Sequence, residues 1–164
     1  MIDSMVKTVI ENITIQDVLE AINKKYGNKT ALRIKNEDGS FREISYVKLG
    51  RRVVSISSVL MNLGINKGDP VAIFSENRPE WAAAYFGIIS CGGAVLPIDV
   101  KLTDNEVQFI LNDSRARCVF VSGKYLATID RLRNVLPYIE NIIVLDKTSR
   151  KDIIQLNKLR PRRG

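Results

Sequence analysis

Continuous hydrophobic runs recur along the chain at a regular spacing. Equivalent positions Val71, Val95, Val119 and Ile143 fall 24 residues apart, which leaves room for a loop, a helix and a second loop each time. Unbroken rather than alternating hydrophobicity is typical of strands that are covered on both faces of a parallel sheet. We therefore expect four buried strands, at 71–75, 94–98, 118–122 and 142–145.

The segments around these runs carry helix signals. Between 46 and 63, apolar residues step by four and three positions, with Ser45 available as N-cap and Gly64 as the stop. Further helices are expected at 14–25, from Pro79 through Ile89, after the capping-box sequence at 103–106, and at 126–136. Strands alternating with helices predict an α/β fold, a three-layer parallel sheet with helices on both faces, built from successive βα units. A helix and a β-hairpin precede it, the hairpin joining 31–34 to 41–45 through Asp38-Gly39.

Two features of this pattern need a separate explanation. Pro97 lies in an expected strand, although proline lacks the N–H that a central strand donates, so it is expected at a strand end or a bulge. The segment 81–98 has 18 residues without a charge, the threshold length for a membrane-spanning helix. Gly92-Gly93 and Pro97 interrupt it, which favours a buried helix followed by a buried strand.

Composition is that of a globular protein, with 45% hydrophobic and 26% charged residues among 164. The absence of histidine excludes Ser-His-Asp hydrolysis, Cys-His proteolysis and histidine-built zinc sites. The formal charge is +7, and 147–164 carries seven basic residues and one acid, so the rest of the chain is almost neutral. We expect a subdomain at 1–146 and a basic, poorly ordered tail at 147–164. An arm for nucleic acid or acidic lipid is the alternative, weakened for nucleic acid because the tail has no aromatic residue.

The cysteines indicate the compartment. Cys91 and Cys118 lie far apart in apolar runs and form no CxxC pair, so we expect free thiols in a reducing, cytoplasmic environment. Residues 1–12 show no signal-peptide core.

The known phosphate-binding loops are absent from the sequence. No Gly-x-Gly-x-x-Gly follows the first buried run, and 122–125 lacks the first glycine and the final hydroxyl of a Walker loop. Glu76, Glu80 and Asp99 lie near the carboxyl ends of strands, where open α/β sheets place their clefts. Helix-start charge and loop solvation account for these carboxylates as well as a function does.

Several ordered blocks carry a family resemblance: Ile44-Ser45-Tyr46, 49–53, 63–73, Asn77-Arg78-Pro79-Glu80-Trp81, 87–97, 102–106 and 110–114. At this spacing they resemble the N-terminal part of AMP-forming acyl-CoA synthetases, in the adenylate-forming superfamily, and in particular long-chain fatty-acid CoA ligases. The resemblance covers roughly 12–146. Proline at the strand of Pro97 is habitual in this family.

The resemblance implies a ligase that joins a fatty acid to coenzyme A, using ATP and Mg²⁺ and releasing AMP and pyrophosphate. The phosphate loop, the Tyr-Gly-x-Thr-Glu segment, the ribose-binding Asp and the catalytic Lys of that family are not found here. No catalytic, cofactor-binding or metal residue is therefore assigned to any position. The chain is expected to be an N-terminal fragment, a structural lobe that is inactive alone and needs no cofactor of its own.

The expected partners follow from the same hypothesis. They are the missing remainder of the synthetase and, through exposed apolar faces, a second copy of the chain; no nucleic acid and at most peripheral membrane contact are expected. The alternatives are the N-terminal part of an aryl-acid or nonribosomal-peptide-type adenylating enzyme, or a stand-alone interaction domain that uses its basic tail.

Overall fold

The structure, a computed structural model, describes residues 13–36 and 38–159. Residues 1–12, for which no signal peptide was expected, and 160–164, the end of the expected tail, lie outside the described residues. The chain forms two compact units that divide between Arg51 and Arg52. Its elements are α2 (Ile15–Tyr26), β1 (Thr30–Lys35), β2 (Phe41–Ser45), α3 (Tyr46–Asn62), β3 (Pro70–Phe74), α4 (Pro79–Ser90), β4 (Ala94–Ile98), α5 (Asp104–Asp113), β5 (Cys118–Val121), α6 (Leu126–Leu132), the 3₁₀ turn η1 (Arg133–Val135), β6 (Asn141–Val144), β7 (Ile154–Gln155) and the 3₁₀ turn η2 (Leu156–Lys158).

The first unit contains the predicted helix and hairpin. Thr14 caps α2 in a capping box, in which the Asp17 N–H donates to Thr14 Oγ1 at 3.2 Å and the Thr14 N–H donates to the Asp17 carboxylate at 2.8 Å. β1 and β2 pair antiparallel. Gly39, with φ +84°, supplies the left-handed backbone of the turn between them. Both sequence predictions for this region are confirmed.

The second unit is built on a parallel five-stranded sheet. The strand order is β4-β3-β5-β6-β7, and each neighbouring pair is parallel. The four hydrophobic runs became β3 to β6, each within one residue of its predicted limits. The regular spacing of the hydrophobic runs therefore correctly predicted successive βα units.

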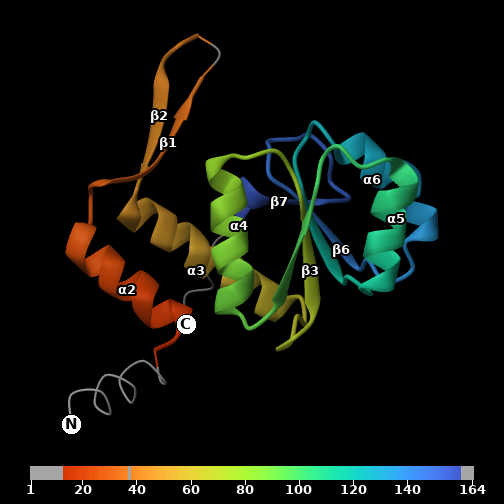
Figure 1. Ribbon diagram of the computed structural model, residues 1–164, viewed down its shortest axis with the longest axis horizontal. Helices are drawn as coiled ribbons and strands as arrows, with labels where there is room; N and C mark the ends of the chain where they lie inside the picture. Colours follow the sequence, from red (N-terminus) through yellow and green to blue (C-terminus); the bar gives the residue numbers. More distant parts are fainter. Residues whose placement is uncertain (1–12, 37, 160–164) are drawn as a thin grey trace. The chain divides into compact units, whose positions relative to one another are not determined.

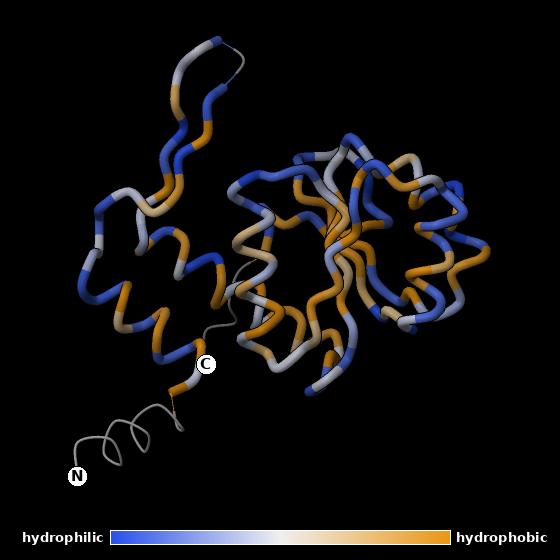
Figure 2. Tube along the Cα trace, viewed as in Figure 1, coloured by the Kyte–Doolittle hydropathy of each residue, from blue (hydrophilic) through white to orange (hydrophobic). Residues whose placement is uncertain are grey.

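Helices cover both faces of this sheet. α5 and α6 pack on one face, where Val107, Leu111 and Ile129 join side chains of β3, β5 and β6 in one hydrophobic cluster. α4 lies on the other side of the sheet (Figure 1), with Ala84 and Ile88 fully buried. Hydrophobic residues concentrate along the strands and polar residues in the surrounding loops (Figure 2). The predicted three-layer α/β architecture is confirmed.

The strand β4 differs from the prediction of burial on both faces. Among residues 13–36 and 38–159 it lies at the edge of the sheet with β3 as its one partner, and Ala94 and Pro97 are exposed. An edge strand needs to donate hydrogen bonds on one side only, so proline is tolerated here without a bulge. The register of β3 with β4 runs unbroken through the pair Ile73 and Pro97.

The uncharged segment 81–98 forms α4 and then β4, as its glycines and proline predicted. Among the described residues, no helix is both long enough and apolar enough to cross a membrane.

The expectation of a poorly ordered tail from 147 is wrong for the part that is described. Residues 154–155 form β7, which extends the sheet beside β6, and Ile153 is buried in the hydrophobic cluster. Arg150 forms ion pairs with Asp130 and Asp152. The prediction from charge density failed because Arg150 has one acidic partner within the segment, Asp152, and a second one 20 residues earlier, Asp130.

Candidate functional site

The strand order defines one crevice at the carboxyl edge of the sheet. The connection after β3 leads through α4 to β4 on one side, and the connection after β5 leads through α6 to β6 on the other. β3 and β5 are neighbours whose connections diverge, which is the switch point where open α/β sheets bind ligands. The residues that follow β3, β5 and β6 are therefore the candidate functional site.

Arg78 is the centre of this site. Its Nη2 donates to Asp146 Oδ1 at 2.8 Å and its Nη1 to Asp146 Oδ2 at 2.9 Å, a bidentate pair that ties the loop after β3 to the end of β6. The Arg78 Nε donates to Glu80 Oε2 at 3.0 Å, and Nη1 lies 3.5 Å from Glu76 Oε1. The Arg78 side chain is 16% exposed, so these interactions are partly shielded from water.

Two further groups close the network. Ser122, which follows β5, donates its hydroxyl to Glu76 Oε2 at 2.7 Å, across the switch point. The Gly123 N–H donates to Asp146 Oδ2 at 2.6 Å. The carboxyl ends of β3, β5 and β6 are thus joined by direct hydrogen bonds.

The local sequence explains why Arg78 and Glu80 lie here. Arg78 is the N-cap of α4 and keeps extended backbone, and Pro79 opens the helix at its first position, where its missing N–H costs nothing. Glu80 lies in the first turn, where a carboxylate is favoured by the helix dipole, and Arg52 Nη1 of α3 lies 3.3 Å from Glu80 Oε1. Glu80 is buried, so its two arginine partners compensate a charge that is otherwise costly.

Ionisation in the network is strongly coupled to these contacts. Burial alone would lower the pKa of Arg78, but hydrogen bonds to Asp146 and Glu80 raise it above its ordinary value. Burial alone would raise the pKa of Asp146, but hydrogen bonds from Arg78 and the Gly123 N–H lower it. Arg78 and Asp146 therefore form a charged pair at neutral pH.

These contacts do not suit the network to bind a nucleotide or a metal. A phosphate needs donors, yet the Arg78 guanidinium and the Gly123 N–H both already serve Asp146. The part of the chain that is described contains no group of three or more His, Cys, Asp or Glu placed to hold a metal ion. The donors of Arg78 and Gly123 thus connect the loops that follow β3, β5 and β6 to one another.

The structure separates the three carboxylates that sequence pattern brought together. Glu76 and Glu80 meet at Arg78, as their strand-end positions suggested. Asp99 lies after the edge strand β4, is exposed, and accepts from the Lys101 N–H at 2.9 Å in a turn. Asp146 was not singled out from sequence, although it follows the run 142–145 in the same way that Glu76 follows β3.

The cysteines offer no reactive thiol. Cys118 is fully buried, and burial raises its pKa far above the ordinary thiol value. Burial also raises the pKa of Cys91, which is half-buried. Both thiols are therefore protonated and poorly nucleophilic near neutral pH.

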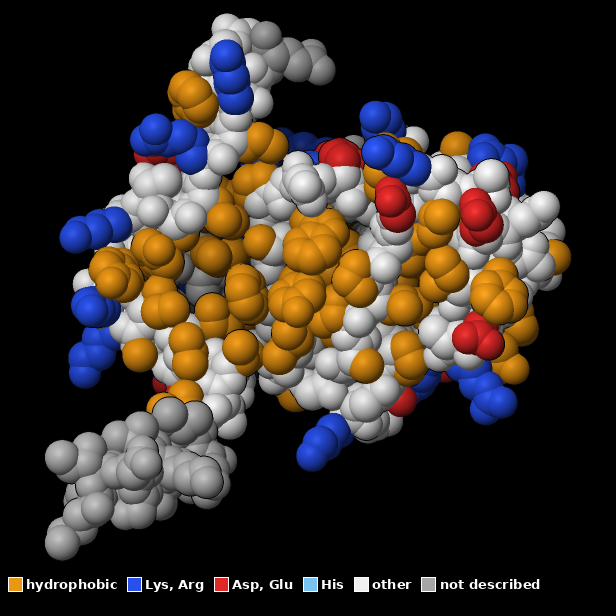
Figure 3. Space-filling model, viewed as in Figure 1, with side chains coloured by type: hydrophobic (Ala, Val, Ile, Leu, Met, Phe, Trp, Pro, Cys, Tyr) orange, Lys and Arg blue, Asp and Glu red, His pale blue; other side chains and the backbone are white. Residues whose placement is uncertain are grey.

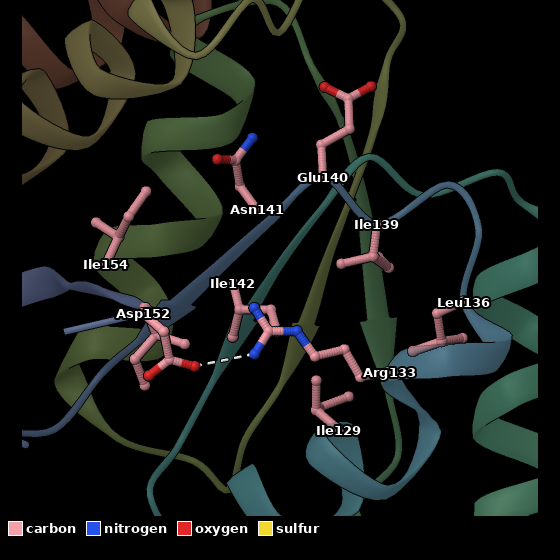
Figure 4. Close-up of a pocket in the computed structure, with 10 residues that line it drawn as sticks. Ile129, Arg133, Leu136, Ile139, Glu140, Asn141, Ile142, Asp152 and Ile154 are labelled. Atoms are coloured by element: carbon pink, nitrogen blue, oxygen red, sulfur yellow. Dashed lines mark hydrogen bonds and ion pairs between the residues drawn. The ribbon is translucent and has the colours of Figure 1, made fainter. Parts of the chain in front are cut away.

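A small cavity lies elsewhere, between η1 and the strands β6 and β7 (Figure 4). Its volume is about 90 Å³, and apolar side chains including Ile129, Leu136 and Ile142 line it. Arg133 and Asp152 form an ion pair of 2.9 Å across it. Small-molecule sites usually measure about 300–1,000 Å³, so this cavity is too small for a nucleotide.

A larger hollow of about 520 Å³ is lined by residues of the segment 148–159, among them Arg150, Lys151 and Lys158. All its lining residues come from this one segment. It is therefore an open shelf beside β7 rather than a cleft between elements.

Comparison with known proteins identifies the family of this α/β fold. The model of the AMP-binding enzyme family matches residues 19–162. The crotonobetaine/carnitine–CoA ligase of Citrobacter koseri is 30% identical over 117 residues, which are 71% of this chain and 23% of that ligase.

Solved structures agree with this assignment. The anthranilate CoA ligase AuaEII, in complex with anthranoyl-AMP, is 28% identical with a TM-score of 0.80, over 90% of this chain and 27% of that one. A fatty acyl CoA synthetase of Mycobacterium tuberculosis is 26% identical with a TM-score of 0.70, over 81% of this chain and 26% of that one. The chain spans about a quarter of the length of these relatives. It belongs to the AMP-binding enzyme family.

Proposed function

We propose that this chain is the N-terminal structural lobe of an AMP-forming acid–CoA ligase. Its role is to support the reactive part of the enzyme, which we call the remainder: the portion of the matched relatives that this chain does not span. In the complete enzyme a carboxylic acid reacts with ATP to give an acyl-adenylate and pyrophosphate, and the acyl group passes to coenzyme A. We propose that the chain alone does not catalyse the first step.

One observation carries the proposal. The family model extends over residues 19–162, yet the only polar network at the sheet's switch point, within the described residues, is closed on itself around Arg78. A lobe that used this edge for catalysis would keep hydrogen-bond donors free for phosphate or carboxylate groups. Donors that serve neighbouring loops instead stabilise the position of those loops.

Pyrophosphate exchange tests the proposal. The purified chain is incubated with ATP, Mg²⁺, labelled pyrophosphate and a panel of carboxylic acids, and acid-dependent exchange into ATP is measured. No exchange above the acid-free rate is expected from the chain alone, whereas a matched relative of full length is the positive control. Acid-dependent exchange by the chain alone contradicts the proposal.

We propose a fatty acid as the substrate of the complete enzyme, with an aryl acid as the alternative. The likeness to the M. tuberculosis fatty acyl CoA synthetase supports the first and the likeness to anthranilate CoA ligase supports the second. Replacing the matching segment of each of these two enzymes by this chain, and assaying both acids with each hybrid, separates the two. Preferential rescue of the anthranilate enzyme would favour the aryl acid.

We also propose a cytoplasmic location and weak self-association of the isolated chain. Two unpaired cysteines support the first. Exposed hydrophobic side chains such as Phe109, 69% exposed, and Val54, 58% exposed, support the second. Sedimentation over a range of concentrations tests self-association, and a monomer at the highest concentration would contradict it.

A further inference from the structure

The helix α4 is hydrophobic on both of its faces. The inner face, with Ala83, Ala84 and Ile88 fully buried, packs toward the sheet. The opposite positions are also apolar and only half-buried; we call them the outer face of α4, formed by Trp81, Ala82, Tyr85, Phe86 and Ile89. Hydrophobic side chains gather where α4 lies (Figure 3).

This is unusual for a helix that covers a sheet. The outward side of such a helix is normally polar, and a helix that is apolar all round is normally buried in a larger protein. α5, on the other face of the same sheet, exposes the polar residues Asn105, Glu106 and Asp113 beside one apolar residue, Phe109. The outward side of α5 is therefore mainly polar, whereas that of α4 carries apolar side chains at every position named above, which favours a further contact for α4.

The outer face has the character of an interface. The rings of Trp81 and Tyr85 stack with centroids 5.3 Å apart, and Tyr85 and Phe86 meet edge to face at 5.6 Å. Large aromatic side chains held against one another present a rigid, apolar surface at little entropic cost, and such side chains dominate binding energy at interfaces. Glu80, the one charged residue of α4, points to the Arg78 network instead.

Two observations support one occupant for this face. The chain spans about a quarter of the length of its relatives, so in those relatives most of the protein lies outside the matching segment and is available to pack on it. The strand β4, beside which α4 packs, is an edge strand with exposed Ala94 and Pro97 and without a charged residue. An uncharged helix face beside an uncharged strand edge fits an apolar protein surface and does not fit a nucleic acid or an acidic lipid.

We infer that the outer face of α4 is the surface on which the remainder of the synthetase docks, through an uncharged apolar surface of its own. This inference rests on the proposed function, since it names the partner of the structural lobe. Trp81 and Tyr85 are the anchors of the contact.

Co-expression tests this. The tagged chain is produced together with the remainder of the C. koseri ligase, and the amount of remainder that co-purifies is measured; the ligase's own matching segment shows that this remainder can fold. Tyr85→Glu is compared with Phe109→Glu, a matched aromatic-to-acid change on α5. We expect Tyr85→Glu to reduce binding about tenfold or more, as for an interface anchor. Phe109→Glu should change it less than about twofold, as for a surface position away from the contact.

The stability of the isolated chain supplies the second measurement. Because the outer face is half-buried rather than core, both variants should leave its unfolding midpoint nearly unchanged. A large loss of stability with Tyr85→Glu would show that the chain itself covers this face and would overturn the inference. Binding that Tyr85→Glu leaves intact, or no binding where the ligase's own segment binds, overturns it too.

The remaining outcomes separate the inference from its premise. Trp81 is the only tryptophan of the chain, so its emission reports the outer face in the isolated protein. A blue shift that grows with concentration and disappears with Tyr85→Glu would assign the face to a second copy and overturn the inference. A complex that depends on Tyr85 but shows no acid-dependent exchange supports the docking surface and contradicts the proposed function.

Discussion

A guanidinium shared among three carboxylates makes Arg78 the most consequential polar residue of the lobe. Replacing it by glutamine removes both hydrogen bonds to Asp146 and the ion pair with buried Glu80, which keeps Arg52 at 3.3 Å. We expect Arg78→Gln to lower the free energy of unfolding by about 3 kcal/mol, the range for breaking a shielded ion pair. Arg131→Gln breaks an exposed pair with Asp104 that water screens, so it should lower the free energy of unfolding much less.

Urea unfolding of the two variants measures this difference. Equal losses would mean that water screens the Arg78 network as fully as the surface pair, which would contradict the role assigned to its burial.

Asp146 makes this network sensitive to acid. Its pKa in the folded chain lies below the ordinary value of 3.8, so its ion pair stabilises the fold fully above that value. The stabilisation is lost as the pH falls through the folded-state pKa. Asp146→Asn should therefore be less stable than the parent at pH 7, and the difference should shrink as the pH is lowered from about 5 towards 2, over the range where carboxylates titrate. A difference that stays constant over this range would exclude Asp146 as the titrating group.

At the residue scale, the sequence identified half of this network. Glu76, Glu80 and the string around Arg78 stood out because they follow a hydrophobic run or open a helix. Their partner Asp146 lies 68 residues from Arg78, and its role depends on β6 being the second neighbour of β3. The order of strands in a sheet cannot be deduced from hydrophobic periodicity. The pairing of Arg78 with Asp146 could therefore not be predicted from the sequence pattern.

At the element scale, two glycines within helices differ in the space that is available for an added side chain. A Cβ added at Gly87 of α4 would lie 2.5 Å from Ile56 Cγ2, inside the packed contact with α3. A Cβ at Gly50 would meet the side chain of Asn23, which can rotate away. Gly87→Ala should therefore cost about 1–3 kcal/mol through overpacking. Gly50→Ala should be neutral or gain up to about 1 kcal/mol from helix propensity.

Thermal and urea unfolding of both variants provide the measurement. Ile56→Ala removes Cγ2, the nearer of the two clashing atoms, and keeps the Ile56 Cβ position at 2.7 Å. Gly87→Ala should therefore cost less in that background than in the parent, and additive losses in the double variant would show that Cγ2 is not the source of the cost.

Helices and long strands were predictable because each carries a repeated signal. The capping boxes at Thr14 and Thr103 both formed, and the hydrophobic runs gave strands within a residue of their predicted limits. β7 could not be predicted, because its two residues are too few to show a period. Exposure of β4 was missed for the same reason as the Asp146 pairing: an edge position is a property of the sheet, not of the strand.

At the scale of the whole molecule, net charge was a poor guide to order. The sequence places an excess of six positive charges in 147–164, which is typical of a solvated terminus. In the structure Arg150 pairs with Asp130 and Asp152, and Asp152 pairs in turn with Arg133. Part of the positive charge of the segment is thus paired with acidic residues, Asp152 within the segment and Asp130 in α6.

The role of residues 149–159 can be decided by truncation. These residues add β7 to the sheet and bury Ile153, which is 7% exposed, against the cluster of α6 and β6. Burying one large aliphatic side chain is worth roughly 1.5–3 kcal/mol, and the Arg150 pairs add little because water reaches them in part. A chain that ends at Thr148 should therefore be less stable than one that ends at Leu159 by about 2 kcal/mol in urea unfolding. The chain ending at Leu159 keeps every described contact and should match the full chain. Equal stability of all three would show that 149–159 contributes nothing to the lobe, and that its boundary lies near residue 146 as the charge pattern indicated.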